Sequence, residues 1–278
     1  MKLAISNIAW DISEDQDIAT LLRQHAIDAI DVAPGKYFPD PAATTAAQID
    51  EIRKGWAEHG IGITGMQALL FGTQGLNLFG SIASQAAMLK HLRHICRIGA
   101  GLGATRLVFG SPKNRDRSGL DDEHLTQIYL CFFRALGDIA REHGVTICLE
   151  PNPVCYGANF MTDTPQTAQV VREVDHPHIL MQLDTGSLTI NDEDPFDVLD
   201  AHAELIGHVH ASERDLQTLG DGDTDHVAMA TALNRHLPRQ LVSIEMLPNR
   251  HEPHPVTIER ALNVAIHHYR NAAVEMYA

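Results

Sequence analysis

The sequence predicts an α/β fold, a single (β/α)8 or TIM barrel over residues 1–278. Short apolar, β-branched runs alternate with longer amphipathic segments along the whole chain, which is typical of βα units built on a parallel sheet. Eight such pairs can be counted, and a chain of 278 residues suits this fold, which typically takes about 250. No Pro/Ser-rich linker, charge block or change of composition divides the chain, so we expect one domain.

The expected strands begin roughly 26 to 43 residues apart, which leaves room for a strand, a helix and two loops. They cover residues 3–6, 29–33, 62–66, 105–110, 146–150, 179–184, 206–210 and 241–245. An open doubly wound sheet is the alternative. Its usual GxGxxG turn is missing after the first strand, where SNIAWD stands, and this favours the barrel.

The segments between the strands carry apolar residues at a spacing of three to four, as helices that cover a barrel do. Ser13, Thr45 and Thr164 precede three of these helices and are predicted N-caps. Asp225 is expected to cap the helix that follows the seventh strand. An amphipathic last helix is expected over residues 261–277.

Composition and charge limit the classes of partner. The formal net charge of −15 would repel a polyanion at long range, so we do not expect a nucleic-acid partner. The four cysteines show no CxxC spacing and are expected to be free thiols in a reducing compartment. No signal peptide and no run of about 18 apolar residues is evident. A cytoplasmic protein without a membrane partner is therefore expected.

Four late strands end in a residue that can bind a metal ion. These residues are Glu150, Asp184, His210 and Glu245. Taken singly, each could instead cap a neighbouring loop. The C-terminal ends of barrel strands converge on one mouth, however, and burying several carboxylates together without a cation is costly. Three carboxylates and an imidazole favour one divalent ion, preferably Mn²⁺, with Mg²⁺, Co²⁺ and then Zn²⁺ as alternatives. His208 lies on the same face of its strand as His210 and is expected deeper in the barrel.

Motifs along almost the whole chain resemble those of the sugar phosphate isomerase/epimerase family. The members of this family are xylose isomerase-like TIM barrels and include the ketose 3-epimerases. These motifs are LEPNP, LDTG, GHVHASE, GDGDTDH and SIEM, with SNIAWD, DVAP and GSPKNR also similar. The resemblance implies that Glu150 and Glu245 are the catalytic acid/base pair on opposite faces of the sugar. It also implies that Asp184 and His210 serve only as metal ligands.

The chain departs from the ketose 3-epimerase pattern at two positions. Ser187 stands where those enzymes have a histidine, three residues after the metal-binding Asp184. Leu216 stands where they have a substrate-binding arginine, and the nearby Arg214 is a candidate substitute. The two departures argue against free-ketose epimerisation of the standard kind.

Further residues at the predicted mouth are candidates for substrate binding. They are Asn7, Trp10, Gln67, Lys113, Arg115, Asn152, Ser187, Glu213 and Arg214. Lys113 and Arg115 either hold a substrate carboxylate or phosphate or form a solvated basic loop. Trp10 either forms a floor for a sugar ring or packs within its loop. Asn152 is expected to position the substrate or the adjacent glutamate, and Glu213 to orient His210 or Arg214.

The sequence thus predicts a metal-dependent isomerase or epimerase that acts on a ketose, keto-sugar or sugar acid through an enediolate. Carboxylates beside a metal-activated C–H bond can remove and return its proton. A lyase that decarboxylates or dehydrates a keto sugar acid is the main alternative. DNA repair is disfavoured because the extra histidine ligands of the apurinic endonucleases are absent. A sugar-binding protein would not need paired acid/base groups. A small-molecule substrate and a homo-oligomer are expected.

Overall fold

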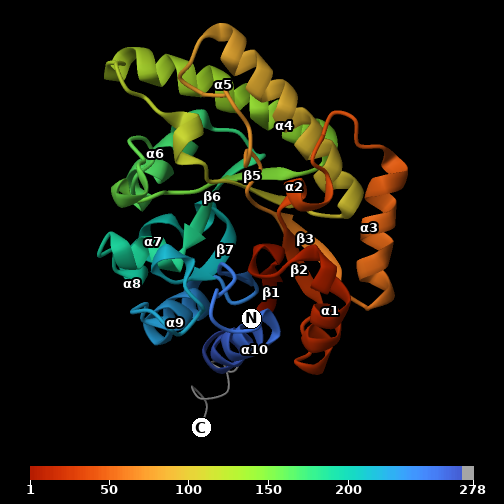
Figure 1. Cartoon of the computed structure of the whole chain (residues 1–278). Helices are drawn as coiled ribbons and strands as arrows, with labels where there is room; N and C mark the ends of the chain where they lie inside the picture. The colour runs from red at the N-terminus through yellow and green to blue at the C-terminus, as the bar shows by residue number, and fades with distance from the viewer. Residues whose placement is uncertain (271–278) are drawn as a thin grey trace.

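Eight parallel strands close into a barrel in chain order, with β8 pairing back to β1 (Figure 1). The computed structural model describes residues 1–270. The strands are β1 (Lys2–Ser6), β2 (Ala29–Val32), β3 (Gly62–Met66), β4 (Arg106–Phe109), β5 (Thr146–Leu149), β6 (Ile179–Asp184), β7 (Ile206–Ser212) and β8 (Leu241–Glu245). The predicted fold class is confirmed, and every predicted strand lies where the apolar runs indicated.

Helices form a ring around the strands (Figure 1). They are α1 (Asp15–Gln24), α2 (Pro34–Tyr37), α3 (Ala46–Glu58), α4 (Ile82–Leu102), α5 (Asp122–His143), α6 (Thr164–Val174), α7 (Thr185–Ile190), α8 (Pro195–His202), α9 (His226–His236) and α10 (His254–Ala265). Asp225 caps α9 as predicted, since its carboxylate accepts from the backbone N–H groups of Val227 and Ala228. Within residues 1–270, none of the helices combines the length and apolar character needed to cross a bilayer.

One of the three other predicted N-caps is confirmed. Thr45 forms a capping box at the start of α3. Ser13 is not a cap, because the Asp11 carboxylate accepts from the N–H of Ser13 and caps the preceding 3-10 turn. Thr164 is the first residue of α6, and Asp163 caps that helix. In both cases a carboxylate one or two residues upstream satisfies the free N–H groups at the helix start.

The last helix begins earlier than predicted. It starts at His254, with a proline in its first turn, and passes into a π-helical turn over Ile266–Arg270. Proline suits the first turn of a helix because its missing N–H has no helical partner there. Residues 271–277 of the predicted helix lie outside the described residues.

Strand register aligns the polar ends of the late strands. Asp184 pairs with His210 across β6 and β7, and Ser212 pairs with Glu245 across β7 and β8. Most strand residues are buried and many are apolar, as in other parallel barrels, but Asp31, Gln182, His208 and Ser243 are buried polar residues within the strands. The strand-end residues Asp184, His210, Ser212 and Glu245 lie at the C-terminal mouth, where the barrel core ends.

Candidate active site

Glu150, Asp184, His210 and Glu245 converge at the mouth of the barrel. One potential ligand atom from each lies within 4.8 Å of the others. His210 is 1% exposed, Asp184 5% and Glu150 9%, so three of the four are buried. The four strand-end residues singled out in the sequence are thus neighbours in space.

The charges of this cluster strongly perturb one another. Burial, followed by the charges of Glu245 and Asp184, raises the pKa of Glu150 to about 8. Burial opposes a charged His210 ring, but Glu245 and Glu150 together raise the pKa of His210 to about 10. His210 Nδ1 lies 3.1 Å from Glu245 Oε2 and 3.7 Å from Glu150 Oε1. Protons on Glu150 and His210 reduce the net negative charge of this cluster. A divalent cation would balance the same charge, and the oxygen-rich donor set fits such an ion.

Asp184 is held in place by two donors. The backbone N–H of Ser187 donates to Asp184 Oδ1 at 2.7 Å, and the Ser212 hydroxyl donates to Oδ2 at 2.7 Å. The Ser187 hydroxyl lies 3.4 Å from the carbonyl oxygen of Pro151, which makes it a weak donor to the backbone. The contribution of Ser187 in this structure is to orient Asp184.

Glu150 is approached by an amide and a buried guanidinium. Asn152 Nδ2 donates to Glu150 Oε2 at 3.0 Å, and Arg115 Nη2 donates to Asn152 Oδ1 at 2.5 Å. Arg115 is fully buried, and within residues 1–270 its Nε and Nη1 have no hydrogen-bond acceptor. Burial lowers the pKa of Arg115 to about 10, while the charge of Glu150 opposes this shift. Gly110 leaves space for the Glu150 carboxylate, because a Cβ atom at position 110 would collide with it.

Glu245 differs from Glu150 in its ionisation. Burial opposes its charge, but His210 and a hydrogen bond from Gln67 hold the pKa of Glu245 below its usual range. Gln67 Nε2 donates to Glu245 Oε1 at 2.5 Å. The environment therefore favours the protonated form of Glu150 and the ionised form of Glu245, although the two side chains have equal intrinsic acidity. Such separation is characteristic of acid/base pairs in enzymes.

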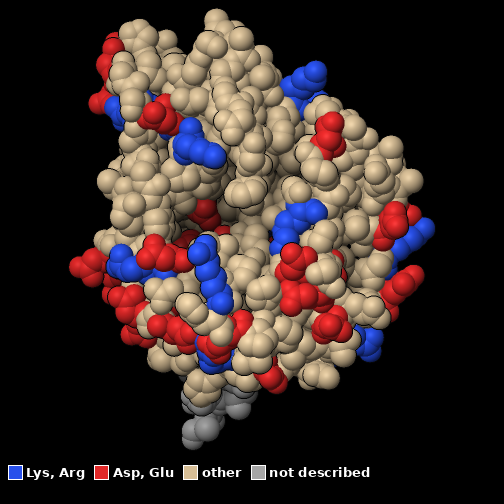
Figure 2. Space-filling view, viewed as in Figure 1, with Lys and Arg blue, Asp and Glu red and all other residues tan. Residues whose placement is uncertain are grey.

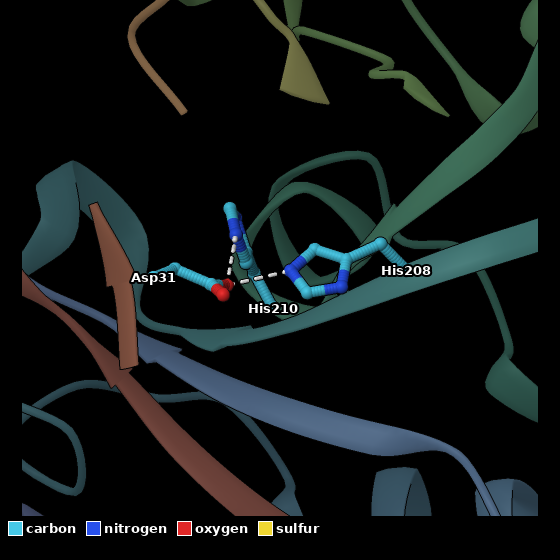
Figure 3. A group of neighbouring side chains, drawn as sticks. All are labelled: Asp31, His208 and His210. Carbon is cyan, nitrogen blue, oxygen red and sulfur yellow. Dashed lines mark hydrogen bonds and ion pairs between the residues drawn. The ribbon is translucent and has the colours of Figure 1, made fainter. Parts of the chain in front are cut away.

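A second cluster lies behind His210. Asp31, from β2, points toward both imidazoles of β7 (Figure 3). Its Oδ2 lies 2.7 Å from His208 Nε2 and 4.0 Å from His210 Nε2. Burial opposes its ionisation, but the two imidazoles hold the pKa of Asp31 below its usual range. Asp31 is not among the residues predicted from the sequence, although an acidic residue inside the apolar run AIDVA was a usable signal.

A cavity of about 550 Å³ opens over the acidic cluster. Acidic atoms lie in the depth of the hollow, and Lys or Arg side chains lie around its rim among uncharged residues (Figure 2). Glu150, Glu245 and Gln67 line the cavity together with two lysines, Lys36 and Lys113. Lys36 donates to the backbone carbonyl oxygens of Asn7 and Trp10 and is thereby tied to the first loop. Lys113 is exposed and, within residues 1–270, makes no hydrogen bond or ion pair.

Other predicted substrate contacts lie away from the cavity. Asn7 is buried, and its Oδ1 accepts from the backbone N–H of Ala33 at 2.8 Å. Trp10 is 1% exposed, packs edge-on against Trp56 and donates its indole N–H to Asp15. Both residues therefore connect the loops beneath the mouth.

Arg214 also lies outside the cavity wall, in the 3-10 turn Arg214–Leu216, whereas Leu216 itself lines the cavity. The position that the resemblance associates with a substrate-binding arginine therefore presents an apolar side chain, and Arg214 does not replace the guanidinium in this structure.

Glu213 organises the loop between β7 and α9. Its carboxylate accepts from the backbone N–H groups of Gly220 and Thr224 and contacts His226 Nε2 at 2.9 Å. The other ring nitrogen of His226 lies 2.7 Å from the buried Tyr269 hydroxyl. Burial opposes ionisation, yet these donors lower the pKa of Glu213 to about 2. Glu213 thus binds its own loop and, through His226, the C-terminal segment, and within residues 1–270 no hydrogen bond or ion pair joins it to His210 or Arg214.

Comparisons with known proteins agree with this fold. The chain aligns over its whole length with the structure of L-ribulose 3-epimerase, with 18% identity, 97% coverage of that chain and a TM-score of 0.82. It aligns with 3-keto-D-glucoside 4-epimerase from E. coli at 17% identity, covering 95% of this chain and 99% of that one, with a TM-score of 0.77. It also aligns with the zinc-containing IOLI protein at 16% identity, covering 98% and 99%, with a TM-score of 0.75.

Identities this low establish the fold alone. A search by sequence among curated proteins finds no significant match. The profile of the xylose isomerase-like TIM barrel family, in contrast, matches residues 19–265, which is most of the chain. This match confirms the resemblance drawn from the motifs, and we conclude that the chain belongs to the xylose isomerase-like TIM barrel family.

Proposed function

We propose that this protein is a divalent-metal-dependent isomerase or epimerase that moves a proton on a ketose, keto-sugar or sugar acid. The observation that carries the proposal is the pair of glutamates with opposite pKa shifts, Glu150 and Glu245, in one cavity over a cluster of metal-ligand type. The sugar epimerases among its structural neighbours support the reaction class.

Glu150, Asp184, His210 and Glu245 would hold the metal, and Mn²⁺ is the ion we propose. When bound, such an ion acidifies a C–H bond next to a carbonyl and stabilises the negative charge of the enediolate. The zinc atom bound by the structurally similar IOLI protein supports metal binding by this chain.

The two glutamates divide the proton transfer between them. Glu245, held ionised by His210 and Gln67, accepts the proton of the substrate carbon. Glu150, whose carboxylate burial makes more basic than usual, is the partner that returns a proton to the substrate, with Asn152 holding its carboxyl group in place. Gln67 and Asn152 therefore act as positioning residues, and the reverse reaction exchanges the two roles.

A lyase acting on a keto sugar acid is the second candidate, and one observation favours it. Lys113 lines the cavity and has no partner among residues 1–270, so its ammonium group is available for a substrate carboxylate. Product mass separates the two reactions, because isomerisation conserves mass whereas a lyase releases water or carbon dioxide.

Incubation in D2O with Mn²⁺ and a panel of ketoses, 3-keto-glycosides and keto sugar acids tests the proposal. We expect deuterium to enter the carbon next to the carbonyl of at least one compound. Glu150→Gln and Glu245→Gln should each lower the exchange rate by about 100- to 10,000-fold, the range for loss of a general acid or base. If the metal-loaded protein exchanges no compound, or if both variants exchange at the wild-type rate, the proposal is wrong.

A further inference from the structure

The cavity has two chemically distinct halves. Its inner end carries Glu150, Glu245 and Gln67, whereas most of its remaining surface is apolar. The apolar lining includes Leu69, Leu70, Phe71, Leu216 and Leu247. A plain monosaccharide presents hydroxyl groups on every side, and an apolar wall leaves those groups without partners. The outer half is therefore poorly suited to a sugar ring.

Parts of the apolar wall are exposed to solvent. Phe71 is 84% exposed and Leu247 is 49% exposed. Scattered apolar residues are ordinary on a protein surface, but these side chains border the same cavity that contains the acidic pair. An apolar surface continuous with a reactive site is typical of a ligand-binding subsite.

The loops that carry this wall adopt unusual backbone conformations. Ala68 and Leu216, both in the cavity lining, have positive φ angles of 53° and 52°. Residues with a Cβ atom seldom adopt this conformation, and it is concentrated at functional sites. The backbone N–H of Leu247 donates to the carbonyl oxygen of Leu216 at 2.8 Å, so the loops after β7 and β8 are bound together. This hydrogen bond fixes the backbones of Leu216 and Leu247 relative to each other.

The cavity itself indicates the kind of occupant. Its volume of about 550 Å³ falls within the range of roughly 300 to 1,000 Å³ for pockets that take drug-sized ligands. A second protein chain seated on the apolar wall would cover the cavity that Glu150 and Glu245 line. One small molecule with a sugar at its inner end and an apolar group at its outer end fits both halves.

We propose that the substrate is a keto-sugar glycoside with an apolar, aromatic aglycone, and that Phe71, Leu216 and Leu247 bind the aglycone. This inference rests on the proposed function for the sugar end of the ligand. Leu216 is then a specificity-determining residue, because it presents an apolar side chain over the substrate where an arginine would bind a hydroxyl group.

Deuterium exchange of two substrates that differ only in the aglycone tests the inference. The Mn²⁺-loaded protein is given phenyl and methyl 3-keto-β-D-glucopyranoside in D2O. We expect kcat/KM to be roughly 10- to 200-fold higher for the phenyl compound, the range for a few carbon atoms in an apolar pocket. Leu247→Asn and Leu216→Asn should each lower this preference. Asparagine tolerates the left-handed conformation at position 216, so the loop should keep its course.

Ile12→Asn serves as the matched control. Ile12 is 44% exposed, a fraction similar to the 49% of Leu247, and it lies outside the cavity lining. The control should keep the wild-type preference for the phenyl compound. Equal kcat/KM for the two glycosides in the wild-type protein would overturn the inference, as would a preference that both cavity variants retain in full.

Binding without turnover separates this inference from the proposed function. Calorimetry with unreactive phenyl and methyl β-D-glucopyranoside measures the aglycone preference alone. One outcome is that no keto-sugar exchanges deuterium, but the phenyl glucoside binds more tightly than the methyl glucoside and Leu247→Asn removes this difference. The proposed reaction is then wrong, and the apolar subsite is supported. If exchange occurs without any phenyl preference in binding or in rate, the reaction is supported and the subsite is wrong.

Discussion

Replacing Asp31 with asparagine tests whether the carboxylate behind His210 supports the metal site. Asp31 is fully buried, and its Oδ2 lies 4.0 Å from His210 Nε2 and 2.7 Å from His208 Nε2. A histidine ligand commonly relies on a carboxylate near its second ring nitrogen, which orients the ring and increases its basicity. We expect Asp31→Asn to bind Mn²⁺ about 10- to 100-fold more weakly than the wild type.

The geometry limits the size of this effect. Two unit charges 4.0 Å apart interact by about 4 kcal/mol at an effective dielectric constant near 20, which sets an upper bound. The expected loss in affinity corresponds to about 1.4 to 2.7 kcal/mol. It falls below the bound because the asparagine carbonyl oxygen can still accept a hydrogen bond from an imidazole.

Calorimetric titration of the metal-free proteins with Mn²⁺ measures the difference directly. Asp28→Asn is the control, since Asp28 is an exposed aspartate just before β2 and should bind Mn²⁺ like the wild type. Thermal unfolding of the metal-free variants separates a loss of affinity from a loss of fold. An Asp31→Asn protein that is folded and binds Mn²⁺ within about a factor of two of the wild type would refute the reasoning.

Three further perturbations probe the same mouth. The pKa of Glu150 is raised to about 8 and that of His210 to about 10, so both side chains hold a proton near pH 7 when no metal is bound. Mn²⁺ binding should therefore release at least one proton, and the affinity for Mn²⁺ should increase as pH rises. Calorimetry in buffers of different ionisation enthalpy measures the release, and a pH-independent affinity would contradict it. Glu213→Gln should lower the free energy of unfolding by about 2 kcal/mol in urea titrations near neutral pH. The folded pKa of Glu213 is about 2, so its contribution is complete above the unfolded value of about 4.3, and the difference should shrink as pH falls toward 2. Gly110→Ala should abolish deuterium exchange in a folded protein, because the new methyl group displaces the Glu150 carboxylate; full activity would show that Glu150 can occupy another position.

The barrel was predictable because its strands are buried on both faces. Such strands appear as short apolar runs, and eight of them at regular spacing leave few alternative folds. The convergence of Glu150, Asp184, His210 and Glu245 could be predicted for a related reason. In a barrel, the C-terminal ends of all strands lie at the same mouth, so residues at these positions are neighbours in space even when they are far apart in the sequence.

Burial and direction of the loop side chains depended on the tertiary structure. Arg115 belongs to a basic, loop-like stretch of sequence but is fully buried against Asn152. Trp10 follows the first strand, as a sugar-stacking residue would, but packs against Trp56. Loop conformation depends on contacts with distant segments, and local sequence carries little information about those contacts.

Asp31 and the apolar wall depend on segments that are far apart in the chain. Asp31 meets His208 only because the barrel closes β2 opposite β7 across its interior, and Phe71, Leu216 and Leu247 come from three separate loops. Local patterns of hydrophobicity therefore specify the strands, the helices and the chemistry at the strand ends. The closure of the chain on itself decides which side chains face one another, since packing and electrostatic contacts act through space and not along the sequence.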